Sequence, residues 1–145
     1  MFLEGIVNMI LVSACLLGIN CKYNGDNNDN DRVKKYLEGK VFIPVCPEQL
    51  GGLSTPRPPA EINGDKVITK DNKDVTTNFI KGAEETLKTA KLQGCKKAIL
   101  KEGSPSCGSN FIYDGTFSGT KVEKMGVTAS LLKSNQIEVV SEKEL

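Results

Sequence analysis

Short runs of apolar residues recur along the chain without helical periodicity. Such runs, closed by glycine, proline or polar clusters, are typical of strands that are buried on both faces of a sheet. They predict strands over residues 10–15, 41–45, 98–100 and 137–140. We expect Pro44 and Pro47 to stop the second of these strands, because proline cannot donate to a sheet ladder.

Between these runs, apolar residues three or four positions apart predict helices. The longest such pattern runs from residue 74 to Gly94, and its shared face consists of Phe79, Ala83, Leu87 and Ala90. Shorter helices are expected over 31–37, with Asp31 as the capping residue, and over 127–133. Asn63-Gly64, between short apolar segments, predicts a small hairpin.

The order of these elements is strand, helix, strand, hairpin, helix, strand, loop, helix, strand. This alternation predicts an α/β fold, a three-layer domain with a mainly parallel sheet and a small hairpin insertion. Residues 1–8 are expected to be a flexible N-terminal extension, and residues 9–145 a single domain.

Composition narrows the chemistry. Lys and Arg total 19 against 18 Asp and Glu, so the formal charge of +1 offers no attraction to a nucleic acid polymer. The chain has no histidine, which excludes Ser-His-Asp and Cys-His nucleophiles and histidine-ligated zinc. The remaining chemistry must use cysteine, carboxylates, hydroxyls, lysine or the backbone.

The N-terminal segment predicts a cytoplasmic protein. It has Glu4 and no Lys or Arg before the first apolar run, whereas a secretory leader begins with positive charge. The run over 9–19 is also well short of the roughly 20 residues that span a bilayer. We therefore expect no membrane partner.

Three of the five cysteines lie where predicted strands end. Cys15 closes the first strand, Cys46 closes the second, and Cys107 lies in the loop after the third. Ligands of open α/β sheets bind at the carboxyl ends of strands, so these thiols are expected to converge there. Cys21 either joins this cluster or packs beneath the loop, and Cys95, at a helix end, is expected to be structural or exposed.

Thiolates without histidine favour an iron–sulfur cluster over zinc, because structural zinc needs four ligands. A cubane held by three thiolates leaves one iron open as a Lewis acid for a soft atom such as sulfur. The sequence also allows a structural zinc held by Cys15, Cys21, Cys46 and Cys107, or a metal-free sulfur carrier. The carrier would form a persulfide on Cys107, with Lys22 or Lys101 lowering the pKa of its thiol.

Polar residues beside these cysteines suggest further roles. Glu48, two residues after Cys46, is the general acid/base candidate, against the alternative of a solvated helix-start carboxylate. Ser104 and Ser106 can donate to a ligand or simply stabilise their turn. Arg57, set among prolines, can bind an anion or pair with Glu61.

The chain resembles the thiouracil desulfidase family, short prokaryotic iron–sulfur proteins that were formerly classed as a domain of unknown function. The resemblance runs in order over nearly the whole chain. It rests on VSACLLG (12–18), CPEQLGGLSTPRPPAEI (46–62), DVT (74–76), LKEGSPSCG (100–108), IYDGTFSG (112–119) and GVTASLL (126–132).

The resemblance implies a Rossmann-like catalytic desulfidase domain with a 4Fe–4S cluster. By motif, the three protein ligands are Cys15, Cys46 and Cys107, the acid/base carboxylate is Glu48, and the proton-relaying serine is Ser104. The implied reaction is non-redox. It converts thiouracil or a related thiolated pyrimidine or nucleotide to the oxo base and hydrogen sulfide, with sulfide as a transient ligand of the fourth iron.

Substrate contacts are assigned to the remaining polar residues near the cluster, namely Cys21, Lys22, Tyr23, Arg57 and Ser106. Many relatives have Cys-Arg-Tyr-Asp-Gly where this chain has Cys-Lys-Tyr-Asn-Gly from residue 21, so the contacts of this loop differ. The substrate can also be another small sulfur compound such as cysteine. A homodimer is compatible with the sequence.

Overall fold

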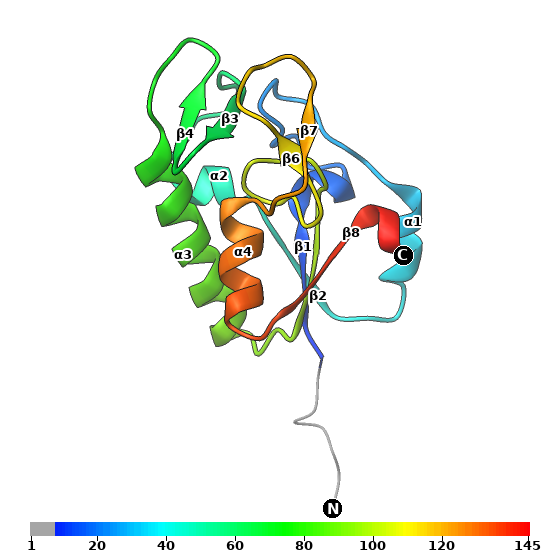
Figure 1. The fold of residues 1–145 in the computed structure, drawn as a ribbon. Helices are drawn as coiled ribbons and strands as arrows, with labels where there is room; N and C mark the ends of the chain where they lie inside the picture. The colour runs from blue at the N-terminus through cyan, green and yellow to red at the C-terminus, as the bar shows by residue number, and fades with distance from the viewer. Residues whose placement is uncertain (1–7) are drawn as a thin grey trace, which may run out of the picture.

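Four parallel strands form the centre of the molecule (Figure 1). The computed structural model describes residues 8–145, and the sheet order is β2-β1-β5-β8. The strands are β1 (Ile10–Ser13), β2 (Phe42–Val45), β5 (Lys97–Leu100) and β8 (Glu138–Ser141). All three strand pairs are parallel, so the carboxyl ends of the strands meet at one edge.

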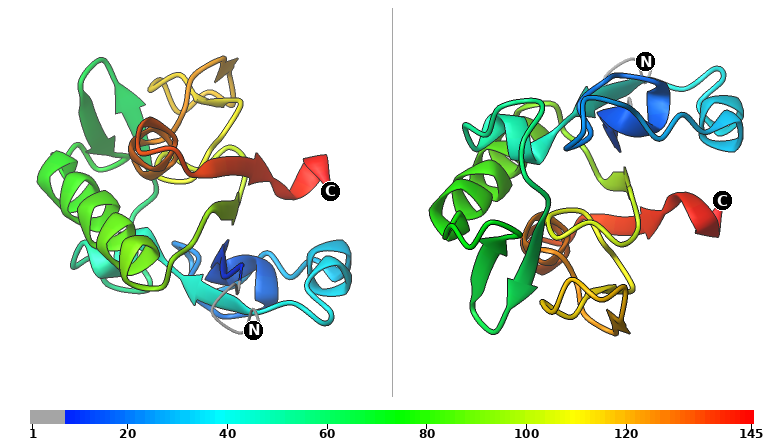
Figure 2. Two further views of the ribbon diagram at one scale, coloured as in Figure 1. Left: turned by 90° about the horizontal axis from the view of Figure 1, so that it is seen from below. Right: turned by 90° about the horizontal axis from the view of Figure 1, so that it is seen from above.

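Helices cover both faces of this sheet (Figure 2). The side chains of Leu11, Ala98 and Leu100 pack toward α3 and α4, whereas Ile10, Val12 and Ile99 pack on the opposite face with α1. The helices are α1 (Asp31–Tyr36), α2 (Pro47–Leu50), α3 (Thr76–Leu92) and α4 (Val127–Ser134), with short 3₁₀ helices at Ala14–Leu17 and Glu142–Glu144. The predicted three-layer α/β architecture is confirmed.

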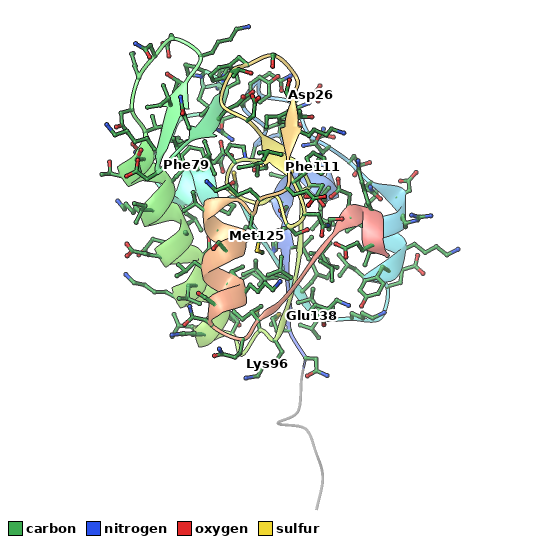
Figure 3. The ribbon with its side chains drawn as sticks, in the orientation of Figure 1. Asp26, Phe79, Lys96, Phe111, Met125 and Glu138 are labelled. Carbon is green, nitrogen blue, oxygen red and sulfur yellow. The ribbon has the colours of Figure 1, made fainter. Side chains whose placement is uncertain are left out.

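Two small hairpins lie beyond the carboxyl edge of the sheet. They are formed by β3 (Ala60–Asn63) with β4 (Lys66–Thr69), and by β6 (Ile112–Tyr113) with β7 (Lys121–Val122). The first confirms the hairpin predicted at Asn63-Gly64. The second was not predicted, because its strands are only two residues long within a Gly/Ser-rich loop. Phe79 of α3, labelled in Figure 3, packs with Ile62 and Ile112 and so joins both hairpins to the helix layer.

The structure corrects the predicted ends of several elements. The first strand ends at Ser13, because Gly18 adopts a left-handed conformation (φ 87°) and caps a 3₁₀ helix that contains Cys15. Pro44 lies inside β2, which tolerates it as an edge strand. Asn30, not Asp31, caps α1 by accepting from the Val33 N–H.

The predicted N-terminal extension, residues 1–8, lies outside the described residues except for its last position. Among residues 8–145 no helix combines the length and the apolar character of a bilayer-spanning segment.

Helix α2 packs against α3 at a contact that admits no side chain. A Cβ atom added to Gly82 would lie 2.0 Å from the Pro47 carbonyl oxygen, and one added to Gly51 would lie 2.0 Å from the Asn78 carbonyl oxygen. Glycine is therefore required at both positions. This close approach of the two backbones fixes α2, and with it Glu48, at the edge of the sheet.

Candidate metal and catalytic site

A cavity of about 400 Å³ opens at the carboxyl ends of β1, β2 and β5. The structure brings all the predicted site residues to its wall: Cys15, Cys21, Lys22, Tyr23, Cys46, Glu48, Arg57, Ser104, Ser106 and Cys107. Cys95 does not line the cavity and is buried in the core beneath α3 and α4. Segments far apart in the sequence therefore converge as the parallel topology predicted.

Cys15, Cys21 and Cys46 line one cavity, and their thiols shift one another's pKa values. A hydrogen bond with Cys21 lowers the pKa of Cys15 to about 7, although burial opposes the shift. A hydrogen bond with Cys21 likewise lowers the pKa of Cys46 to about 6. The same two bonds raise the pKa of Cys21 far above its ordinary value. These directions make Cys21 the thiol of the three that holds its proton most firmly, and Cys15 and Cys46 the two that ionise more readily than an ordinary thiol.

Cys107 is buried, as Cys21 is, whereas Cys15 and Cys46 are partly exposed. Burial raises the pKa of Cys107 to about 12, opposed by hydrogen bonds with the side chains of Ser13 and Ser106. The Ser106 hydroxyl oxygen lies 3.5 Å from the Cys107 sulfur. A metal ion deprotonates a coordinating thiol outright, so a bound metal would compensate for the cost of a buried thiolate here.

Glu48 lies in the first turn of helix α2, directly after Pro47, and both of its carboxylate oxygens have partners. Its Oε1 accepts from Arg57 Nε at 2.9 Å, and its Oε2 accepts from the Ser106 hydroxyl at 3.2 Å. The side chains of Arg57 and Glu48 are only 6% and 16% exposed. The carboxylate is thus a shielded, oriented group that faces the cysteines.

Two serine hydroxyls extend this arrangement. Ser104 Oγ accepts from the backbone N–H of Ser106 at 3.1 Å and of Cys107 at 3.0 Å, which fills both of its lone pairs. Its own proton is then directed to Ser106 Oγ, 3.0 Å away, and the Ser106 proton is directed to Glu48. Donor and acceptor counting therefore gives a hydroxyl chain that runs from Ser104 through Ser106 to the carboxylate.

Arg57 joins three segments of the cavity wall. Its Nη2 donates to the Cys21 carbonyl at 2.8 Å, its backbone N–H donates to the Tyr23 carbonyl at 2.7 Å, and its Nε binds Glu48. The alternative ion pair with Glu61 is wrong, because Glu61 Oε1 instead accepts backbone N–H groups of the 115–117 turn. Arg57 is committed to protein partners.

Tyr113 and Glu102 line the cavity but were not assigned a role on sequence grounds, and Lys101 was considered only in the sulfur-carrier alternative. Tyr113 reaches the cavity from β6, inside the IYDG string. Lys101 follows β5, and its ammonium lies 2.8 Å from the Glu102 carbonyl and 3.4 Å from Glu142 Oε2. Glu102 precedes the Ser104–Cys107 segment. Position after the end of a buried strand is the signal that could have identified Glu102.

The donor set fits an iron–sulfur cluster. Cys15, Cys46 and Cys107 supply soft thiolate donors from three different loops around one cavity. Within residues 8–145 no three His, Cys, Asp or Glu side chains surround a single metal position. The ligands of a 4Fe–4S cubane each bind a different iron, so they need not meet at one point.

Comparisons with known proteins agree with this chemistry. A family model described as 2-thiouracil desulfurase matches residues 10–144. The uncharacterized protein YbbK of Bacillus subtilis (strain 168) is 49% identical over 147 residues, covering 94% of this chain and 97% of that protein. The solved structure of TudS, a [4Fe-4S]-dependent thiouracil desulfidase, superposes with a TM-score of 0.88 at 45% identity, covering 95% and 93% of the two chains. The resemblance found in the sequence motifs is thus confirmed, and the chain belongs to the 2-thiouracil desulfurase family.

Proposed function

We propose that this protein is a 4Fe–4S-dependent desulfidase that converts 2-thiouracil, or a related thiolated pyrimidine, to the oxo base and hydrogen sulfide. The observation that carries the proposal is the convergence of Cys15, Cys46 and Cys107 with Glu48 on one cavity. Membership of the 2-thiouracil desulfurase family and the likeness to TudS support the same chemistry. The cavity volume of about 400 Å³ is in the range of small-molecule sites.

In this proposal Cys15, Cys46 and Cys107 hold the cluster and leave one iron without a protein ligand. When bound, the cluster supplies a Lewis acid for the thiocarbonyl sulfur. The two thiols with lowered pKa values, Cys15 and Cys46, are ready to bind iron as thiolates. In this proposal Cys21 lines the cavity beside the three ligands and is not one of them.

Glu48 acts as the general base. Its carboxylate takes a proton from water as the water oxygen attacks the carbon that bears sulfur. The carbon–oxygen bond forms and the carbon–sulfur bond breaks. The proton that Glu48 takes from water passes to the sulfur, which leaves as hydrosulfide, and the second proton of the water is released to solvent, so no electron is gained or lost overall. Arg57 keeps the carboxylate oriented, and the hydroxyl protons of Ser104 and Ser106 point along one chain toward it, which is where the relay that the family resemblance assigns to Ser104 would act.

The test uses protein reconstituted with iron and sulfide in the absence of oxygen and incubated with 2-thiouracil. We expect about four irons per chain, with uracil and sulfide formed in equal amounts. Replacing Cys15, Cys46 or Cys107 by Ala should abolish both cluster and turnover. Cys95→Ala is the matched control, since Cys95 is a buried thiol outside the cavity.

Glu48→Gln separates catalysis from cluster binding. This variant should keep its iron and lower kcat by about 10²–10⁴, the usual contribution of a general base. Turnover without iron, or full activity in any of the three cysteine variants, would contradict the proposal. Sulfide release from cysteine but not from thiouracil would show that the substrate is a different sulfur compound. A colourless protein that contains zinc would show that the cofactor is not an iron–sulfur cluster.

A further inference from the structure

The segment that carries Ser104, Ser106 and Cys107 is closed into a ring by one side chain. Glu102 Oε1 accepts backbone N–H groups of Ser109 at 2.9 Å, Asn110 at 2.9 Å and Phe111 at 3.2 Å. Its Oε2 accepts from Asn110 Nδ2 at 2.7 Å and from the Ser109 hydroxyl at 3.4 Å. The carboxylate of Glu102 therefore joins the start of this segment to its end.

Glu102 is 3% exposed, and the five donors to its carboxylate are all neutral N–H and O–H groups. Burial raises the pKa of Glu102, but the hydrogen bonds from Asn110, Phe111 and Ser109 outweigh it and hold the pKa below its ordinary range. The loop that Glu102 closes is also closely packed at Gly103. A Cβ on Gly103, which has φ +81°, would lie 3.2 Å from the ring of Phe111, the residue labelled in Figure 3.

The C-terminal turn holds this ring from outside. Glu142, 6% exposed, accepts the Glu102 backbone N–H on Oε1 at 2.8 Å and pairs its Oε2 with Lys101 at 3.4 Å. Glu144 Oε1 accepts from Asn110 Nδ2 at 3.0 Å. The last residues of the chain thus contact both ends of the segment that bears Cys107.

We propose that Glu102 is a positioning residue which, seated on Glu142, fixes the 103–108 segment so that Cys107 and Ser104 are held toward the cavity. Its effect on iron retention rests on the function proposed above, whereas its effect on the order of the segment does not. Glu102 acts through the backbone and through Asn110, and it does not contact substrate. Replacing a residue that orients a metal ligand in this way commonly lowers metal affinity about 10- to 100-fold.

The test of the segment's order uses metal-free protein and hydrogen exchange. Glu102→Gln keeps the shape of the side chain but places an amide N–H₂ or a single acceptor oxygen where five donors converge. We expect the amides of residues 109–111 to exchange at least about tenfold faster than in the wild type. The matched control is Glu61→Gln, because Glu61 also accepts backbone N–H groups at this cavity, from Gly115 and Phe117. It should speed exchange at 115–117 only.

The second test measures iron. In reconstituted protein, an iron(II) chelator should remove iron from Glu102→Gln about 10- to 100-fold faster than from wild type, and from Glu61→Gln at the wild-type rate. Asn110→Ala is a milder variant, because it removes only the side-chain donor to Glu102. It provides the same test if Glu102→Gln does not fold. Its exchange should also rise at 109–111.

The outcomes separate the two proposals. Unchanged exchange at 109–111 in both folded variants would overturn the positioning role, whatever the cofactor. Faster exchange in protein that never binds iron would keep the positioning role and overturn the proposed function. Faster exchange with unchanged iron release would overturn the effect of Glu102 on Cys107.

Discussion

Removing the guanidinium of Arg57 is the most informative single perturbation of the site. Arg57→Met keeps the aliphatic stem but leaves the Glu48 carboxylate, 16% exposed, without its cation, and leaves the buried Cys21 carbonyl without its donor. Water can replace the hydrogen bonds of Arg57 to the exposed Ser54 and to Thr55, so their loss adds little to the cost of the substitution.

Breaking a buried ion pair by removing one partner costs about 3–5 kcal/mol, because the remaining charge is uncompensated. Both side chains are less than a third exposed, so this figure applies with little reduction for solvent screening. We expect the free energy of unfolding to fall by about 3–5 kcal/mol. The assay is urea unfolding of metal-free protein under reducing conditions.

A double-mutant cycle with Glu48→Gln tests the cause. A neutral amide at position 48 needs no cation, so Arg57→Met should cost about 1–2 kcal/mol less in that background. Costs that add within about 0.5 kcal/mol would refute the reasoning. So would an Arg57→Met protein as stable as the wild type.

Two further predictions concern the thiols and the helix contact. In metal-free folded protein, alkylation of Cys46 should fall to half near pH 6, because below its lowered pKa the thiolate is protonated. Cys21→Ala should move this midpoint toward the ordinary value of about 8.5, and Cys107 should stay unlabelled at pH 8. Mass spectrometry of the labelled peptides measures both, and a Cys46 midpoint near 8.5 in the wild type would contradict them. Gly82→Ala should destabilise by about 1–3 kcal/mol, although alanine favours helices, because its Cβ would meet the Pro47 carbonyl. Urea unfolding measures whether the free energy of unfolding of Gly82→Ala falls, as predicted, or rises.

Local pattern was sufficient for most of the fold. The apolar runs of β1 and β5 form buried strands as predicted, and the spacing of Phe79, Ala83 and Ala90 gives one buried helix face, whereas β2 is an edge strand whose Phe42 is 40% exposed. Parallel strands then place their carboxyl ends together, so Cys15, Cys46 and the segment with Cys107 had to approach one edge. Element ends were less predictable, since the left-handed turn at Gly18 and the edge position of Pro44 depend on neighbours.

The chemistry available at the site follows from the residue types alone: thiols without histidine, one carboxylate beside Cys46, and paired hydroxyls before Cys107. Which partners these groups have depends on how the chain packs. It placed Ser106 between Ser104 and Glu48, gave Arg57 to Glu48 instead of Glu61, and used Glu102 to close a loop. Hydrophobic periodicity can be recognised within a few consecutive residues. A hydrogen bond between groups tens of residues apart depends instead on distances of a few ångströms, which are set when the whole chain packs.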